Sequence, residues 1–84
     1  MPIIFSSISW EDYQYWLEND RKKLERINKI IKDCLRNPFK GIGKPEPLKH
    51  NLQGCWSRRI DDEHRLIYEY SSGNISIISC RNHY

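Results

Sequence analysis

The sequence has 84 residues, with three Trp, five Tyr and two Phe, and a formal net charge of +3. This length allows one domain with a small core, and the aromatic content argues against a disordered chain. No apolar run approaches the roughly 18 residues of a membrane span, and three widely spaced cysteines favour reduced thiols in a cytosol over a disulfide framework or zinc site.

The N-terminal part predicts a short strand and a first helix. Residues 3–5 are β-prone. Ser9 and Asp12 have the spacing of a capping box, in which the Ser9 hydroxyl would cap an early amide of a helix over residues 9–19. The apolar residues at helical spacing in this helix are Trp10, Tyr13 and Leu17.

A second helix is expected after Asn19. Asp20 is a candidate N-cap, and Asn37 before Pro38 ends the helix because proline disfavours helical geometry in the preceding residue. The apolar stripe comprises Leu24, Ile27, Ile30 or Ile31, and Leu35. Residues 38–47 contain three prolines and two glycines, so they are expected to form a loop.

Beyond this loop the apolar pattern changes to a period of two, which predicts four strands. The strands are expected at residues 48–52, 55–60, 65–70 and 75–80, with turns at 53–54, 61–63 and 71–74. A short N-terminal strand, two helices and then an antiparallel sheet make an α+β fold, in which the helices cover one face.

The expected turns also predict which strand residues face each other. A simple hairpin at 71–74 would pair Tyr70 with Ile75, Tyr68 with Ile77 and Leu66 with Ser79. A compact turn at 61–63 would place Arg59 opposite Arg65, on the other face of the sheet. Two facing cations lower stability unless an anion lies between them, so this face is a candidate phosphate site.

The positive charge is concentrated in the middle of the chain. Residues 36–59 carry six basic side chains and one acidic side chain, Glu46, whereas residues 1–35 carry six of each. A basic block of this kind is expected where a polyanion docks. A solvated basic loop is the alternative interpretation.

Several segments together resemble one family. They are Lys44 to His50, Trp56 to Ile60, Glu63 to Leu66, Cys80-Arg81 and the terminal His83-Tyr84. This set is similar to the YoeB (Txe/YoeB) toxins of the RelE superfamily, which are ribosome-dependent mRNA interferases. The resemblance covers residues 1–84 as a single domain and implies a RelE-like microbial ribonuclease fold.

The resemblance implies a role for each residue in cleavage of RNA by its own 2′-hydroxyl. Glu46 would be the general base, His83 the general acid and Arg65 the main cation at the transition state, while Tyr84 would orient the scissile nucleotide or phosphate. The implied RNA- or phosphate-binding residues are Lys44, Lys49, Arg58 and Arg59. The expected products are a 2′,3′-cyclic phosphate and a 5′-hydroxyl, with no cofactor and no metal.

Structural alternatives exist for these residues. Glu46 could instead form an ion pair with Lys44 or Lys49, and Arg65 could form a surface salt bridge with the 61–63 turn. His83 could belong to a frayed tail. The aromatic residues Trp10, Tyr13, Trp16 and Trp56 could stack on bases, but their spacing favours core or subunit packing.

The resemblance also implies a setting for the protein, as a cytoplasmic toxin of a bacterial type II toxin-antitoxin system that inhibits translation. The expected partners are a YefM/Axe-like antitoxin with an acidic tail, the ribosome with mRNA, and a second copy of the chain. Operator DNA would be bound only by the complex with the antitoxin. No membrane partner is expected. Two other functions stay open, a non-enzymatic ribosome ligand or transcriptional co-repressor, and a ribosome-independent ribonuclease.

Overall fold

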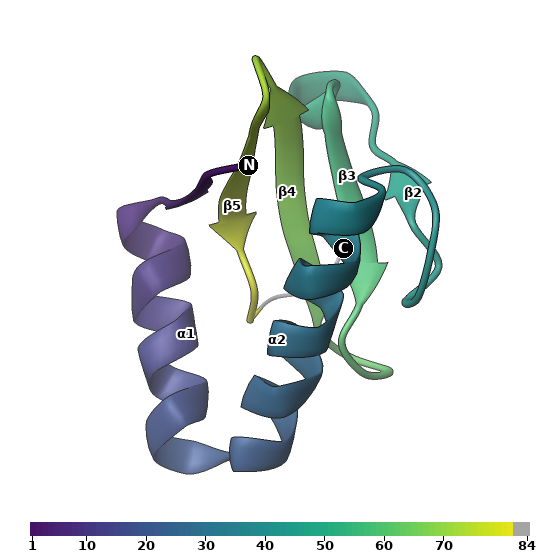
Figure 1. The fold of residues 1–84 in the computed structure, drawn as a ribbon. Coiled ribbons are helices and arrows are strands. Elements are labelled where there is room, and N and C mark those ends of the chain that lie inside the picture. The colour runs from purple at the N-terminus through teal and green to yellow at the C-terminus, as the bar shows by residue number, and fades with distance from the viewer. Residues whose placement is uncertain (82–84) are drawn as a thin grey trace.

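The computed structural model describes residues 1–81 and has two helices packed on one face of a five-stranded sheet (Figure 1). The elements are β1 (Ile3–Phe5), α1 (Ser7–Asn19), α2 (Arg21–Arg36), β2 (Glu46–Pro47), a 3-10 turn η1 (His50–Leu52), β3 (Cys55–Arg59), β4 (Arg65–Ser71) and β5 (Asn74–Ser79). The strand order is β1-β5-β4-β3-β2, with β1 parallel to β5 and the other pairs antiparallel. The predicted α+β fold is confirmed.

The start of α1 differs from the prediction. Ser6 is the N-cap, and its Oγ accepts a hydrogen bond from the Ser9 amide at 3.0 Å. Ser9 is buried inside the first turn, and Asp12 contacts the far end of the chain instead of the helix start. The capping-box interpretation was therefore wrong, because the cap lies three residues earlier than Ser9.

The limits of α2 agree with the sequence. The Asp20 side chain accepts hydrogen bonds from the amides of Lys22 and Lys23, which confirms it as the N-cap, and the helix ends at Arg36. Its buried residues are Leu24, Ile27, Ile30, Ile31 and Cys34. Leu35, expected in this stripe, is only partly buried against the core.

The core lies between the helix pair and the sheet. From the sheet it includes Ile60, Leu66, Tyr68, Ile75, Ile77 and Cys80, and from α1 it includes Trp16. Side chains alternate between the two faces of a strand, so the neighbours of these residues in β3 and β4 point away from the helices. Within residues 1–81, no helix is long and apolar enough to cross a membrane.

The predicted strand at 48–52 was wrong. The edge strand is the two-residue β2, and η1 follows it because His50 has a φ of +60° that breaks the extended run. Pro47 cannot donate a ladder hydrogen bond, which restricts it to an edge position such as this one. Glu46 is therefore part of the sheet, not of the preceding loop.

The hairpin registers agree with the prediction over most of their length. Tyr70 pairs with Ile75, Tyr68 pairs with Ile77, and Arg59 pairs with Arg65. The predicted pairing of Leu66 with Ser79 was wrong, since a register shift between Ile67 and Tyr68 puts Ile67 opposite Ser79. One extra residue on a strand produces such a shift.

Candidate functional site

The register of β2, β3 and β4 places three of the expected site residues on one face of the sheet. Glu46 pairs with Ser57, and Arg59, two residues further along β3, pairs with Arg65. Residues paired across antiparallel strands share a face, and diagonal neighbours lie about 7–8 Å apart, within reach of long side chains. A carboxylate and two guanidinium groups thus share the face that points away from the helices.

The side chain of Arg65 is held at the β3–β4 turn. Its Nη1 donates hydrogen bonds to the carbonyl oxygens of Asp61 at 3.1 Å and His64 at 3.4 Å. Among residues 1–81, Arg65 forms no salt bridge with the carboxylates of the turn. Its positive charge is therefore not neutralised by an acidic side chain of this part of the chain.

The Asp61 carboxylate organises the turn that carries Arg65. It accepts hydrogen bonds from the amides of Glu63 and His64, and it forms a 2.8 Å ion pair with Lys23 of α2. Partial burial acts to raise the pKa of Asp61, but the hydrogen bonds from Lys23 and the two amides outweigh burial and lower the pKa to about 2. The turn is therefore bound to α2 by a charged carboxylate.

Lys44 and Lys49 flank Glu46 and are exposed. Lys44 has a φ of +52°, and so it adopts the left-handed backbone region that non-glycine residues rarely enter. Such strained positions cluster at functional sites. In the part of the chain that the structure describes, neither lysine forms an ion pair with Glu46, so the ion-pair alternative is not realised there.

Arg58 does not lie on this surface, and its assignment to RNA or phosphate binding is corrected. It is fully buried, and its guanidinium forms a 2.6 Å ion pair with Asp33 of α2 and a hydrogen bond to the Tyr68 hydroxyl. It also donates to the carbonyl oxygens of Asn37, Lys40 and Ile42. Since β3 alternates, Arg58 points toward the helix side and Arg59 toward the opposite face.

The Arg58–Asp33 pair, which we call the loop anchor, fastens the segment that leads to Glu46. Asp33 accepts a hydrogen bond from the Ile42 amide, and this bond, followed by the contact with Arg58, lowers the pKa of the Asp33 carboxyl. A Cβ at Gly41 would lie 1.8 Å from the Asp33 carboxylate, so only glycine allows this approach. Asp33 was not identified from the sequence; its position on α2 next to buried Cys34 was the available signal.

The expected acid His83 and the expected orienting residue Tyr84 lie outside the described residues. The chain just before them is held by α1, because the Cys80 amide donates to the Asp12 carboxylate at 3.0 Å and Trp16 Nε1 donates to the Cys80 carbonyl at 2.8 Å. Sequence reasoning had given Asp12 a capping role and had placed Trp16 in core or subunit packing. The structure shows that both hold the end of the sheet.

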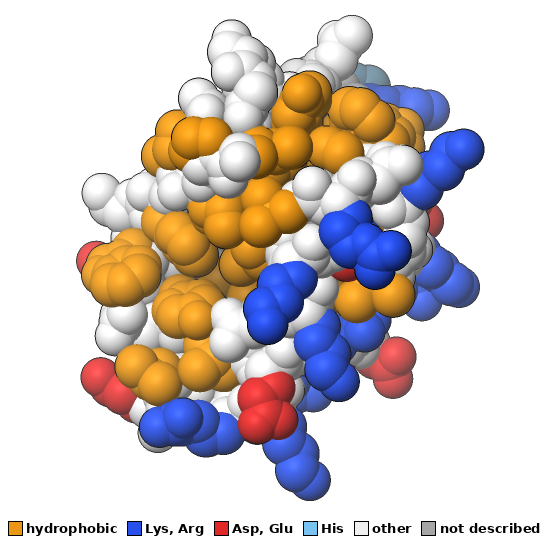
Figure 2. Space-filling model, in the orientation of Figure 1, with side chains coloured by type: hydrophobic (Ala, Val, Ile, Leu, Met, Phe, Trp, Pro, Cys, Tyr) orange, Lys and Arg blue, Asp and Glu red, His pale blue; other side chains and the backbone are white. Residues whose placement is uncertain are grey.

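A second basic surface lies on the helix side of the molecule. Figure 2 shows Lys and Arg side chains gathered over α2. The exposed cations of this helix, which we call the α2 basic stripe, are Arg21, Lys22, Lys29, Lys32 and Arg36. Glu25 is the exposed acidic residue among them. The stripe spans about 22 Å at the helical rise of 1.5 Å per residue.

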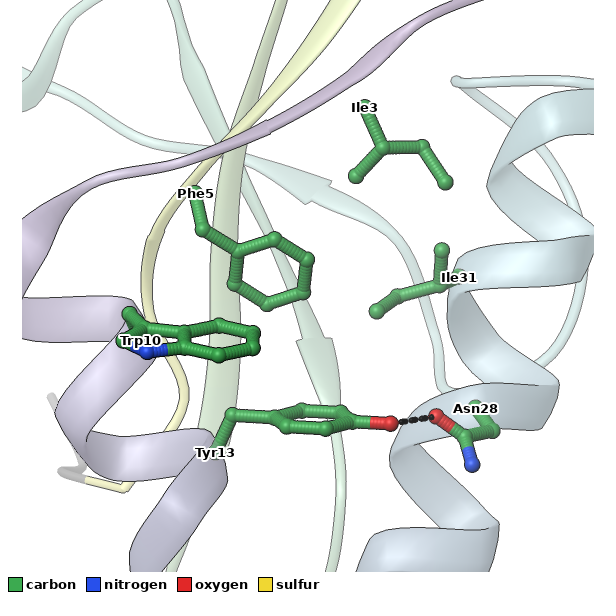
Figure 3. A pocket seen from close by; sticks show the side chains of 6 residues that line it. All are labelled: Ile3, Phe5, Trp10, Tyr13, Asn28 and Ile31. Carbon is green, nitrogen blue, oxygen red and sulfur yellow. Dashed lines mark hydrogen bonds between the residues drawn. The ribbon is translucent and has the colours of Figure 1, made fainter.

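An apolar groove of about 350 Å³ lies beside this stripe, where β1, α1 and α2 meet (Figure 3). Its lining residues are Ile3, Phe5, Trp10, Tyr13, Asn28 and Ile31. Trp10 is 52% exposed and stacks on Tyr13, whose hydroxyl donates to Asn28 at 2.7 Å. Trp16, in contrast, belongs to the core. The Trp10 ring is therefore half exposed at the surface and is not part of the core.

Comparison with known proteins identifies the family. A family model described as the YoeB-like toxin of bacterial type II toxin-antitoxin systems matches residues 5–84. Toxin YoeB of Escherichia coli O6:H1 is 56% identical over 84 residues, which cover 100% of both chains. The chain belongs to the YoeB toxin family. The predicted family is thus confirmed.

Solved structures of YoeB proteins have the same fold. A YoeB dimer from Staphylococcus aureus matches with a TM-score of 0.94 and 48% identity, covering 100% of this chain and 98% of that chain. A YoeB-YefM complex from Staphylococcus aureus matches with a TM-score of 0.92 and 47% identity, with the same coverage. This protein is therefore a toxin of the type II toxin-antitoxin class.

Proposed function

We propose that this YoeB-family toxin is an endoribonuclease that cleaves mRNA in the ribosomal A site and so inhibits translation. The observation that carries this proposal is the shared face of Glu46, Arg59 and Arg65. A base and cations on one exposed face are the groups that general acid/base cleavage of a phosphodiester requires.

In the proposed reaction, Glu46 takes the proton of the ribose 2′-hydroxyl, and the 2′ oxygen attacks the adjacent phosphorus. Arg65 and Arg59 stabilise the negative charge that grows on the phosphorane oxygens. The bond from phosphorus to the 5′ oxygen then breaks, and His83 donates a proton to that leaving oxygen. The products are a 2′,3′-cyclic phosphate and a 5′-hydroxyl, so no co-reactant is consumed. Tyr84 orients the scissile nucleotide, and Lys44 and Lys49 bind flanking phosphates.

The α2 basic stripe supports the ribosome as the place of action. It lies on the helix side, whereas Arg59 and Arg65 lie on the opposite face of the sheet, so the protein presents positive charge to nucleic acid in two directions. Protein cations that neutralise phosphates supply much of the affinity for nucleic acid, independently of its sequence. The ribosomal decoding site, which has RNA on several sides, fits such a charge distribution.

The proposed protein partners are a YefM-like antitoxin and a second copy of the chain. The antitoxin's acidic tail would cover the basic face, and operator DNA would be bound only by the toxin–antitoxin complex. The apolar groove and the exposed Trp10 offer a surface for dimerisation. The proposed location is the bacterial cytoplasm.

The test uses purified, antitoxin-free protein and a defined mRNA, with and without ribosomes, and reads the cut positions and the end groups. Cutting only on ribosomes, with a 5′-hydroxyl on the downstream fragment, is expected. Glu46→Gln should lower the rate by at least about 100-fold, because a positioned base contributes roughly 10²–10⁴-fold. A folded wild-type protein that binds ribosomes without cutting would instead favour the non-enzymatic ribosome ligand or co-repressor.

A further inference from the structure

The end of the sheet is fastened to α1 by two buried side chains. Asp12 accepts the hydrogen bond of the Cys80 amide, and Trp16 donates to the Cys80 carbonyl, so both polar groups of one residue's backbone are fixed. Asp12 is 9% exposed, Trp16 is 5% exposed, and Cys80 is fully buried. Asp12 and Trp16 are four residues apart and so lie on one face of the helix. We call this contact the α1 clamp.

Further contacts hold the same short segment. The Cys80 thiol donates to the Ser9 carbonyl at 3.7 Å, and burial, followed by the nearby Asp12 charge, raises the pKa of this thiol to about 12. The Arg81 guanidinium lies 3.4 Å from the centre of the Tyr15 ring. The Arg81 carbonyl also contacts the His64 ring, which packs edge-on against Trp16. Residues 80 and 81 are thus held by α1 and by the β3–β4 turn together.

The Asp12 side chain supplies an acceptor for a buried backbone amide. A buried N–H without a partner lowers stability, and the 3.0 Å bond to Asp12 has the ordinary length of an N–H···O hydrogen bond. The acceptor oxygen of Asp12 therefore fixes the position of the Cys80 backbone.

We propose that Asp12 and Trp16 are positioning residues for RNA cleavage, because the α1 clamp fixes the backbone of Cys80, which precedes His83 by three residues in the sequence. This inference rests on the proposed function, in which His83 is the general acid. A displacement of about 1 Å in a reacting group can lower a rate about 100-fold.

The experiment is a double-mutant cycle between Asp12 and His83, in which kcat and KM are measured over a range of concentrations of ribosome-bound mRNA. Asp12→Ala is expected to lower kcat about 10- to 100-fold with little change in KM. Asp12→Asn keeps an acceptor oxygen and should retain most of the rate. In the His83→Ala background, Asp12→Ala should cause no further loss, because no acid remains to be positioned. Glu11→Ala, at an exposed neighbouring position, is the matched control and should leave kcat unchanged.

Trp16→Phe provides a second cycle that removes the indole N–H donor together with part of the ring, while an aromatic side chain stays in the core. Circular dichroism at the assay temperature confirms that each variant is folded. If Asp12→Ala and Trp16→Phe lower kcat by the same factor with and without His83, they act independently of the acid and the inference is wrong. If His83→Ala alone leaves kcat unchanged, the proposed acid role fails first, and the clamp has nothing to position.

Discussion

Arg58 and Arg59 are neighbours in β3. Replacing each of them by Met in turn distinguishes the structural role of the loop anchor from the role of the proposed RNA-binding face. Arg58 is fully buried and donates five hydrogen bonds, one of them within its ion pair with Asp33. Arg59 is exposed on the opposite face. Arg58→Met should therefore lower the free energy of unfolding, whereas Arg59→Met should lower RNA cleavage.

The magnitude for Arg58→Met follows from what the substitution leaves behind. Breaking a buried ion pair by removing one partner costs about 3–5 kcal/mol. The Asp33 side chain is 21% exposed, and the three carbonyl groups belong to exposed residues, so water can replace part of the lost bonding. We therefore expect a loss near the lower end, about 3 kcal/mol. A chain of this length has a total stability of about 4–13 kcal/mol, so the loss is a large fraction of it.

The assay is urea unfolding followed by circular dichroism. With a slope of about 1 kcal/mol per molar urea, the midpoint should fall by about 3 M for Arg58→Met. Arg59→Met should stay within about 0.5 kcal/mol of the wild type, as surface substitutions do. Cleavage by Arg58→Met, scaled to its folded fraction, should remain within a few-fold of wild type. An unchanged midpoint together with lost cleavage would refute the structural role and return Arg58 to the RNA-binding set.

Three further predictions concern other parts of the molecule. The pKa of Asp61 is about 2 in the folded protein, against an ordinary value of 3.8. Ionised Asp61 therefore contributes up to about 2 kcal/mol to the free energy of unfolding above pH 4, and this contribution is lost as the pH falls toward 2. Asp61→Asn should flatten this part of an acid-unfolding curve. Lys32→Glu should weaken ribosome binding and reduce the slope of log affinity against log salt concentration by about one. Adding Glu18→Lys on α1 returns the net charge to +3 but should not restore binding. Gly41→Ala should lower the thermal midpoint, because its Cβ would meet the Asp33 carboxylate at 1.8 Å; an unchanged midpoint would contradict the close packing.

Local sequence signals predicted the parts of the fold that depend on short-range physics. The Asp20 cap, the buried face of α2 and the facing of Arg59 and Arg65 each follow from residues a few positions apart. The edge strand was misplaced because its length depends on pairing with β3, which a period-two pattern over residues 48–52 does not reveal. The register shift at Ile67 has no strong local signal either.

The burial of Arg58 shows why part of the site could not be predicted. Of two consecutive arginines in a strand, one must face the core side of the sheet. Arg58 alternates with Trp56 and Ile60, which both pack with the core, so Arg58 is the arginine expected to face the core. Burial of its guanidinium is stable only because Asp33, 25 residues earlier, accepts from it. That partner is brought near by the packing of α2 on the sheet, which is tertiary information.

The two groups proposed to exchange protons with the RNA are supported by different helices. The loop anchor connects α2 to the segment before Glu46, and the α1 clamp connects α1 to the segment before His83. The relative position of these two anchored segments therefore depends on how α1 packs against α2. The hydrogen bond from Tyr13 to Asn28 joins these helices within the apolar groove. A partner seated in this groove would change the site only if it bound one helix arrangement more tightly than another, since equal affinity shifts no equilibrium.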